Sequence, residues 1–182
     1  MNILLSRRPT ARAWTLLLPL AGLLLAPPMP ADAAATNELA PLGGFVGQWH
    51  CTGQFAGGKP IRSVETFTVE LDGRWLHMRH ADTAPNRYAA DEWWGYDRAA
   101  KQFTVTVFDN MGGLRHYVSS GWNGDVLKLE NTATGGYIDR FTFQRSGASQ
   151  YRFAYAHKDE HGTWKPGDEL DCRRAPPASI PQ

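Results

Sequence analysis

Short extended runs separated by turn residues follow one another along most of this 182-residue chain. Pairs such as Asp72-Gly73 and Asn123-Gly124 favour tight turns between antiparallel strands. Helical periodicity never extends beyond a turn or two. About ten such runs, spaced roughly eight to twelve residues apart, predict an all-β antiparallel meander. The runs are residues 45–56, 61–71, 73–81, 89–97, 102–109, 114–120, 126–131, 137–144, 150–157 and 163–172.

The two cysteines, Cys51 and Cys172, lie in the first and last of these runs. In an up-and-down meander these two strands meet when the sheet closes, so a disulfide between them favours a closed barrel over an open sandwich. Trp49 shares a face with Cys51, and we expect it to plug one end of the barrel. The predicted fold class is therefore an all-β, up-and-down antiparallel β-barrel of about 8–10 strands. A reactive or metal-binding thiol pair is the alternative, although no C-x-x-C spacing supports it.

The first 35 residues have the pattern of a secretory signal peptide. Three arginines are followed by an apolar run over residues 14–26 that is too short to span a bilayer. Small residues suit cleavage after Ala33 or Ala35. We therefore expect a periplasmic or secreted protein, in which an even pair of cysteines forms a disulfide.

Removal of residues 1–35 changes the net charge from +1 to −1, because three arginines and Asp32 are lost. A nearly neutral chain without a basic patch argues against a nucleic-acid partner, and no second apolar run predicts a membrane span after cleavage. Six of the seven tryptophans remain to build the core of one domain. We expect an N-terminal turn or lid over residues 36–44, a barrel domain over 45–172 and a disordered tail over 173–182.

Four segments carry a resemblance to a bacterial family of unknown function with a calycin-like barrel. They are Leu42-Gly43-Gly44-Phe45-Val46-Gly47-Gln48-Trp49, Gly73-Arg74-Trp75-Leu76, Gly95-Tyr96-Asp97 and Phe108-Asp109-Asn110-Met111-Gly112. More distantly the chain resembles lipocalins, fatty-acid-binding proteins and nitrobindin-type haem barrels. The resemblance implies a barrel of eight to ten strands with a cavity for a hydrophobic ligand or cofactor, and no known enzyme activity.

Haem is the less favoured cofactor that the resemblance suggests. Nitrobindin-type barrels hold haem through a histidine on a strand near the C-terminus. The corresponding run here, residues 163–172, contains no histidine, and His157 and His161 lie just before it. We therefore predict no cofactor, with haem kept as an alternative.

Polar residues on three runs are candidate anchors for a ligand. His77 and Arg79 share a face with Trp75, and that face either binds an anionic head group inside the barrel or is a solvated outer surface. His116 has Leu114 and Val118 on its face, which is typical of a hydrogen-bonded core histidine. Asp139 also has apolar neighbours, so we expect a structural ion pair with Arg115, Arg140 or a histidine.

Metal binding and catalysis find less support. His77, His80 and His116 form the best histidine trio, but residues 77 and 80 face opposite sides of one strand, so we predict no metal site. No Gly-x-Ser-x-Gly elbow is present, and we predict no catalytic residues. The loop of residues 109–113 is either a simple hairpin or a rim loop with Met111 as an adaptable apolar contact.

The sequence thus favours a barrel that binds a small hydrophobic or amphipathic molecule. The alternatives are a filled-core structural or protein-interaction module and, less favoured, a haem-binding or enzymatic barrel. The oligomeric state stays open. The ligand-binding candidates are Trp75, His77, Arg79, Trp93, Trp94, Phe108, Met111, His116, Tyr137, Asp139, Phe141 and Tyr155.

Overall fold

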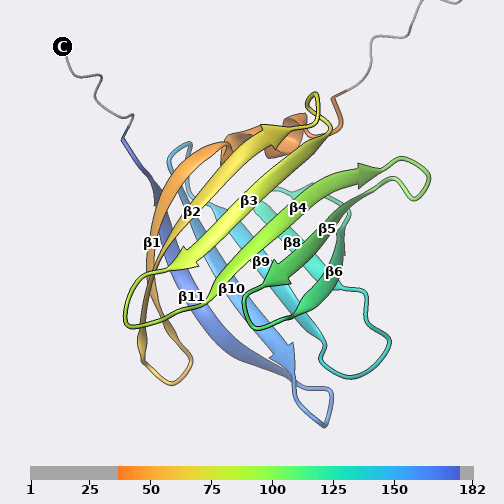
Figure 1. Ribbon diagram of the computed structural model, residues 1–182. Helices are drawn as coiled ribbons and strands as arrows, with labels where there is room; N and C mark the ends of the chain where they lie inside the picture. The colour runs from red at the N-terminus through yellow and green to blue at the C-terminus, as the bar shows by residue number, and fades with distance from the viewer. Residues whose placement is uncertain (1–36, 177–182) are drawn as a thin grey trace, which may run out of the picture. The chain divides into compact units, whose positions relative to one another are not determined.

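The computed structural model describes residues 37–176, so the predicted signal peptide and the last residues of the predicted tail lie outside the described part. A 3-10 helix, η1 (Ala40–Phe45), precedes the strands in Figure 1. The strands are β1 (Gly47–Phe55), β2 (Pro60–Glu70), β3 (Trp75–Asp82), β4 (Ala89–Asp97), β5 (Gln102–Asp109), β6 (Leu114–Ser119), β7 (Trp122–Asn123), β8 (Val126–Asn131), β9 (Asp139–Arg145), β10 (Gln150–Lys158) and β11 (Trp164–Arg174).

The strands form a closed antiparallel β-barrel. Consecutive strands pair with each other from β1 to β6 and again from β8 to β11, and β1 pairs with β11. A short pairing of β6 with β8 closes the remaining gap. The ten barrel strands correspond to the ten predicted runs, and the two-residue β7 pairs only with β8. The predicted up-and-down β-barrel is therefore confirmed.

The disulfide lies at the junction of the first and last strands. Cys51 on β1 is the register partner of Cys172 on β11, and their sulfur atoms are bonded. Both residues are buried among the core side chains. The bond joins positions 121 residues apart in sequence, as the positions of the two cysteines predicted.

One end of the barrel is closed by η1. Pro41 lies in its first turn, and Gly43 and Gly44 allow the chain to turn back toward β1. The ring of Phe45 lies at the centre of an aromatic cluster. The backbone carbonyl of Phe45 accepts a 2.7 Å hydrogen bond from Trp49 Nε1. Trp49 therefore helps to close this end. The rings around Phe45 are those of Phe67, Trp94, Trp122, Phe143 and Tyr151.

β11 extends two residues beyond the predicted end of the barrel. Arg174 is the register partner of Trp49, and its guanidinium lies 4.3 Å from the centre of the Trp49 ring. It also donates hydrogen bonds to the carbonyls of Gly44 and Val46. The assignment of Arg173 and Arg174 to a disordered tail is therefore wrong, because both residues pair with β1.

Alternating side chains divide each strand between the interior and the outer surface. On β5, Phe103, Val105 and Val107 are buried, while the residues between them are partly exposed. The neighbouring strands show the same two-residue alternation, which places apolar side chains on one face and polar side chains on the other. Among residues 37–176, no helix is long and apolar enough to cross a membrane.

Candidate ligand-binding cavity

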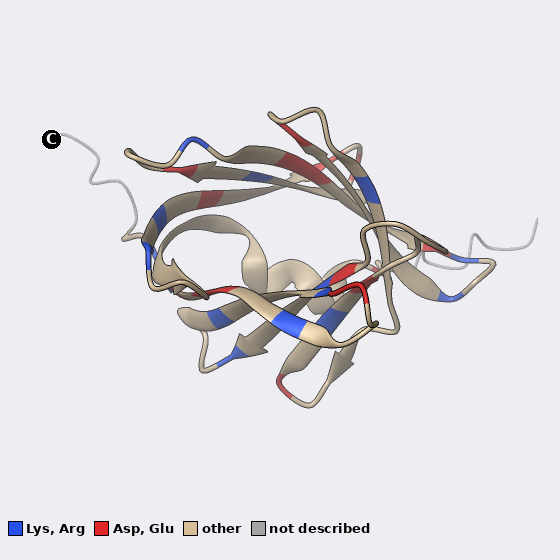
Figure 2. Ribbon diagram, turned by 90° about the horizontal axis from the view of Figure 1, so that it is seen from below, with Lys and Arg blue, Asp and Glu red and all other residues tan. Residues whose placement is uncertain are grey.

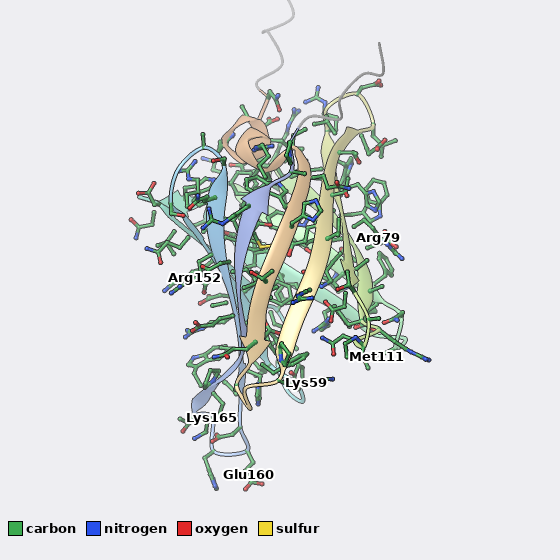
Figure 3. All side chains as sticks on the ribbon, turned by 90° about the vertical axis from the view of Figure 1, so that its left-hand side faces the viewer. Lys59, Arg79, Met111, Arg152, Glu160 and Lys165 are labelled. Atoms are coloured by element: carbon green, nitrogen blue, oxygen red, sulfur yellow. A yellow bond between two sulfur atoms is a disulfide. The ribbon has the colours of Figure 1, made fainter. Side chains whose placement is uncertain are left out.

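A cavity of about 350 Å³ lies inside the barrel at the end opposite η1. Its walls come from the ends of the strands farthest from η1 and from the loops that join them. Figure 3 shows Met111 and Lys59 at this end of the molecule, with η1 at the other. The lining residues are Phe55, Ile61, Glu65, Met78, His80, Asp82, Tyr88, Glu92, Asp109, Met111, Arg115, Phe141, Phe153, Tyr155, Asp168 and Leu170.

The apolar wall of the cavity is largely aromatic. The Phe141 ring on β9 lies 5.5 Å from Phe153 and 5.9 Å from Tyr155, both on β10. The Tyr155 ring covers Gly167 so closely that an added Cβ would lie 2.2 Å from the ring. Glycine is therefore needed on β11 for Tyr155 to hold this position, next to an irregularity in the β10–β11 pairing.

The loop between β5 and β6 forms part of the cavity mouth. Asp109 accepts hydrogen bonds from the backbone N–H groups of Met111 (3.0 Å) and Gly113 (2.8 Å), and Gly112 has a positive φ of 84°. This turn leaves the Met111 side chain 84% exposed at the edge of the cavity. The segment is thus both a hairpin and a rim loop.

A buried histidine lies between two carboxylates on one side of the cavity. His80 Nε2 is 2.9 Å from Asp82 Oδ1, and His80 Nδ1 is 3.4 Å from Glu65 Oε1. Tyr151 donates a hydrogen bond to the other oxygen of Glu65. Burial acts to lower the pKa of His80, but the carboxylates of Asp82 and Glu65 outweigh it and raise the pKa to about 10. His80 is therefore an imidazolium that donates a hydrogen bond to Asp82 and forms an ion pair with Glu65.

Two further carboxyl groups face the cavity with few partners. Glu92 is 6% exposed and accepts a hydrogen bond from Trp94 Nε1. Oδ1 of Asp168 is buried and has no hydrogen-bond partner within residues 37–176. Burial raises the pKa of Glu92 to about 7 and that of Asp168 to about 6. Both groups titrate near neutral pH.

A second polar network supports the wall near the mouth. Asp139 on β9 is fully buried and accepts hydrogen bonds from Arg115 Nη1 (3.0 Å), Tyr117 (2.8 Å) and Asn131 (2.7 Å). Arg115 also contacts Asp109 at 3.2 Å. This is the ion pair of Asp139 that its apolar surroundings led us to expect, with Arg115 as the partner.

The charges that line the cavity are predominantly negative. Five carboxyl groups line it, and His80 and Arg115 are the cationic side chains among the lining residues. Each of these cations is already paired with two carboxylates. Figure 2 views the barrel from this end, with acidic positions on several strands. The cavity can therefore pack an apolar body against its aromatic wall and accept hydrogen bonds or positive charge at its polar side. The carboxyl groups are those of Glu65, Asp82, Glu92, Asp109 and Asp168.

Three of the predicted site residues line the cavity, and two others are buried inside the barrel in contact with lining residues. Met111, Phe141 and Tyr155 line the cavity. Trp94 points into the barrel but is buried in the core next to Phe45. Asp139 lies behind the wall, where it holds Arg115.

The predicted anchors on β3 lie on the outer surface. Trp75, His77 and Arg79 alternate with the buried residues of that strand, and Figure 3 shows Arg79 directed away from the barrel. His77 stacks on Trp93 of β4 and contacts Asp91 at 2.9 Å, and Arg79 pairs with the same carboxylate. The prediction that Trp75, His77, Arg79 and Trp93 bind a ligand inside the barrel is therefore wrong. The alternative, an outer face exposed to solvent, is correct for His77 and Arg79.

Three more predicted residues are also exposed. His116 is on the outer face of β6, where its Nδ1 lies 3.1 Å from Thr106 Oγ1, so its assignment to an apolar core is wrong. Phe108 is exposed on the outer face of β5. Tyr137 is exposed and stacks on His157, with 5.9 Å between ring centres. None of the three is among the residues that line the cavity.

Sequence reasoning missed the buried carboxyl groups of the site. Glu65, Glu92 and Asp168 lie two residues before Phe67, Trp94 and Leu170, respectively, and all three of these apolar residues are buried. Side chains two residues apart share a face of a strand. That spacing was the available signal for the acidic side of the cavity.

The lining residues do not fit haem or a thiolate-bound metal. His80 is the histidine of the cavity, and both of its ring nitrogens are held by carboxylates, so neither is free to ligate iron. Cys51, Cys172 and Glu65 lie close together, but the disulfide leaves no thiolate to bind a metal. The site fits a small organic ligand better.

A shallower hollow of about 290 Å³ lies beside η1. It is bordered by Phe45, Trp49 and Tyr151, whose rings pack against one another, and by Arg145, which lies over the Trp122 ring at 3.8 Å. Arg145 is thus already engaged by an aromatic ring, whereas Asp168 in the interior cavity has a buried oxygen without a partner among the described residues.

Comparisons with known proteins agree with the fold and leave the activity open. The crystal structure of Rv2717c from M. tuberculosis superposes with a TM-score of 0.53 at 12% identity, covering 76% of this chain and 98% of that one, so the two share a fold. EF1p2_mFAP2b bound to DFHBI gives a TM-score of 0.39 at 9% identity, covering 74% and 97% of the two chains. No curated protein matches the sequence.

A family description covers most of the chain. Residues 35–174 match the family described as "Protein of unknown function (DUF1579)". The matched segment includes η1, all the barrel strands and both cysteines. The chain therefore belongs to the DUF1579 family.

Proposed function

We propose that this protein is exported and binds a small apolar or amphipathic molecule inside its barrel. The observation that carries the proposal is the cavity of about 350 Å³, which has an aromatic wall and lies in a barrel whose other end is closed by η1. Ligand pockets in proteins combine such apolar walls with a few convergent polar groups. A filled-core module would have interior space for a few waters at most, so the cavity favours ligand binding.

Two features support export. Residues 1–35 have the pattern of a signal peptide, and the disulfide is of the kind that persists in oxidising compartments. Expression of the full chain in a Gram-negative host, followed by mass analysis of the periplasmic fraction, tests this. The expected product begins at Ala34 or Thr36. Recovery of only the full-length chain from the cytoplasm would contradict export.

Titration with N-phenyl-1-naphthylamine, a neutral apolar fluorophore, tests binding. We expect a saturable rise in fluorescence with one site per chain. Phe153→Trp places a larger ring in the cavity wall and is expected to weaken binding about tenfold. Val69→Trp, on an exposed position of β2, is the matched control and should leave binding unchanged.

Met111→Ala provides a second variant that does not disturb the core, because the side chain is exposed at the mouth. Its affinity for the fluorophore should fall by a smaller factor, about threefold. Equal binding by all of these variants would place the fluorophore on the surface and overturn the proposal.

A further inference from the structure

The polar side of the cavity has more acceptors than its own donors satisfy. His80 is held by Glu65 and Asp82, and Arg115 is held by Asp109 and Asp139. These contacts use both cations of the cavity lining. Arg115 Nε is a buried donor without a partner among the described residues, but the carboxylates of Asp109 and Asp139 already neutralise that guanidinium, so an anionic ligand there would lie beside two negative charges.

Glu92 and Asp168 are left without a cation of their own. Trp94 donates to Oε2 of Glu92, and no residue in the described part of the chain donates to Oε1. Asp168 Oδ1 is buried and has no partner among the described residues. Both carboxyl groups line the cavity, and Glu92 is more than nine-tenths buried. A buried acceptor without a donor, such as Asp168 Oδ1, is rare in folded proteins and points to a missing partner.

The aromatic side chains of the cavity are suited to the same kind of ligand, and Phe55 and Tyr155 are the register partners of Asp168 on the two neighbouring strands. Aromatic rings attract cations through their π-faces, and this attraction strengthens where water is excluded. The raised pKa values of Glu92 and Asp168 arise from burial away from compensating charge, so a cation bound beside them would relieve that penalty. The rings that line the cavity are those of Phe55, Tyr88, Phe141, Phe153 and Tyr155.

We infer that the ligand carries a cationic nitrogen, as an amine or quaternary ammonium, bound beside the carboxyl groups of Asp168 and Glu92 and against the aromatic side chains of the cavity. This inference rests on the proposed binding function and specifies its ligand class. It replaces the anionic head group expected from His77 and Arg79, which lie outside the barrel. The apolar wall favours an organic cation over a metal ion.

Displacement of bound N-phenyl-1-naphthylamine by three ligands with the same tail tests the inference. The ligands are hexyltrimethylammonium, 1-hexanol and hexanoate. We expect the ammonium compound to bind about tenfold more tightly than the alcohol, and hexanoate to bind most weakly. Asp168→Asn and Glu92→Gln should each reduce the tenfold preference for the ammonium compound over the alcohol to about twofold or less.

Asp171→Asn is the matched control. It is the same substitution three residues along β11, at an exposed side chain paired with Arg152, and it should keep the full preference. The inference would be overturned if hexanoate bound as tightly as the ammonium compound or more tightly. It would also be overturned if all three variants lost the preference for the ammonium compound equally. Both outcomes would leave ligand binding intact. Displacement by calcium chloride as effective as by the ammonium compound would assign the carboxyl groups to a metal ion instead. Failure of the fluorophore itself to bind would instead refute the proposed function, and this inference with it.

Discussion

Trp94 Nε1 donates a 2.9 Å hydrogen bond to Glu92 Oε2, joining two side chains that point into the barrel from the same strand. The carboxyl group is buried, and Arg115 and His80 act on it only through space. An indole N–H offsets little of the cost of burying a negative charge. Glu92 is therefore protonated in the folded protein up to about pH 7.

Glu92→Gln should flatten the dependence of stability on pH. The pKa of Glu92 is raised from 4.5 to about 7 on folding, so its contribution to stability is present below pH 4.5 and is lost as the pH rises through 7. The wild type should lose on the order of 2 kcal/mol more than the variant between pH 5 and pH 8. Urea unfolding at both pH values measures the difference.

The difference in pH-dependent stability between wild type and Glu92→Gln reports the titration of Glu92 and not that of other groups. His80 and Asp168 also have raised pKa values, so stability falls with rising pH through them as well, in both proteins. Glu130→Gln, on the exposed face of β8, is the control and should run parallel to wild type. Parallel curves for Glu92→Gln too would show that this carboxyl group titrates normally.

Removal of the disulfide should destabilise the barrel strongly. The bond closes a loop of 121 residues, and the chain-entropy estimate for such a loop is about 4–5 kcal/mol. The double variant Cys51→Ala/Cys172→Ala should lose about this much unfolding free energy in denaturant titrations. Reducing agent should have the same effect on wild type and none on the variant. A shift of only a few tenths of a kcal/mol would mean that the strand pairing alone holds β1 to β11.

The strands were easier to predict than the faces they present. Turn residues mark the ends of strands, so residues 89–97 and 102–109 coincide with β4 and β5. On β3, however, Trp75 is outside and Leu76 and Met78 are inside, so both faces carry large apolar groups. The polarity of the side chains therefore did not indicate which face of β3 points into the barrel. The choice follows from the curvature of the closed sheet, which a single strand does not encode.

The acidic side of the cavity was hidden for a related reason. A glutamate such as Glu65 ordinarily predicts an outward position, because an isolated buried charge is costly. It is tolerable here because His80 on β3 and Tyr151 on β10 provide its partners. Those contacts depend on the register of strands that are distant in sequence. Asp139 was more accessible to prediction, since its apolar neighbours already required a charged partner.

Gly53→Ala should disrupt the pairing of the first and last strands. A Cβ at residue 53 would lie 1.8 Å from the backbone carbonyl oxygen of Glu169, so the strands would have to separate. We expect a loss of about 3 kcal/mol or more. Gly57→Ala, in the following turn, meets no atom within 4 Å and should change stability by less than about 0.5 kcal/mol. Thermal unfolding of both variants measures the contrast, and equal stabilities would mean that β1 and β11 lie farther apart at this point.

Arg115 and Asp139 should show strong energetic coupling. Arg115→Met leaves the Asp139 carboxylate fully buried, with hydrogen bonds only from the neutral groups of Tyr117 and Asn131. Breaking one side of a buried ion pair typically destabilises by about 3–5 kcal/mol.

Asp139→Asn should cost less than Arg115→Met, because Arg115 keeps its contact with Asp109 and is 19% exposed to solvent. In the double variant the buried charge is absent, so its loss of unfolding free energy should be smaller than the sum of the two single losses by at least about 1 kcal/mol. Urea unfolding of the four proteins gives the cycle. Additive losses would show that the 3.0 Å contact between Arg115 and Asp139 contributes nothing of its own, and that the mouth of the cavity is held by the surrounding strands alone.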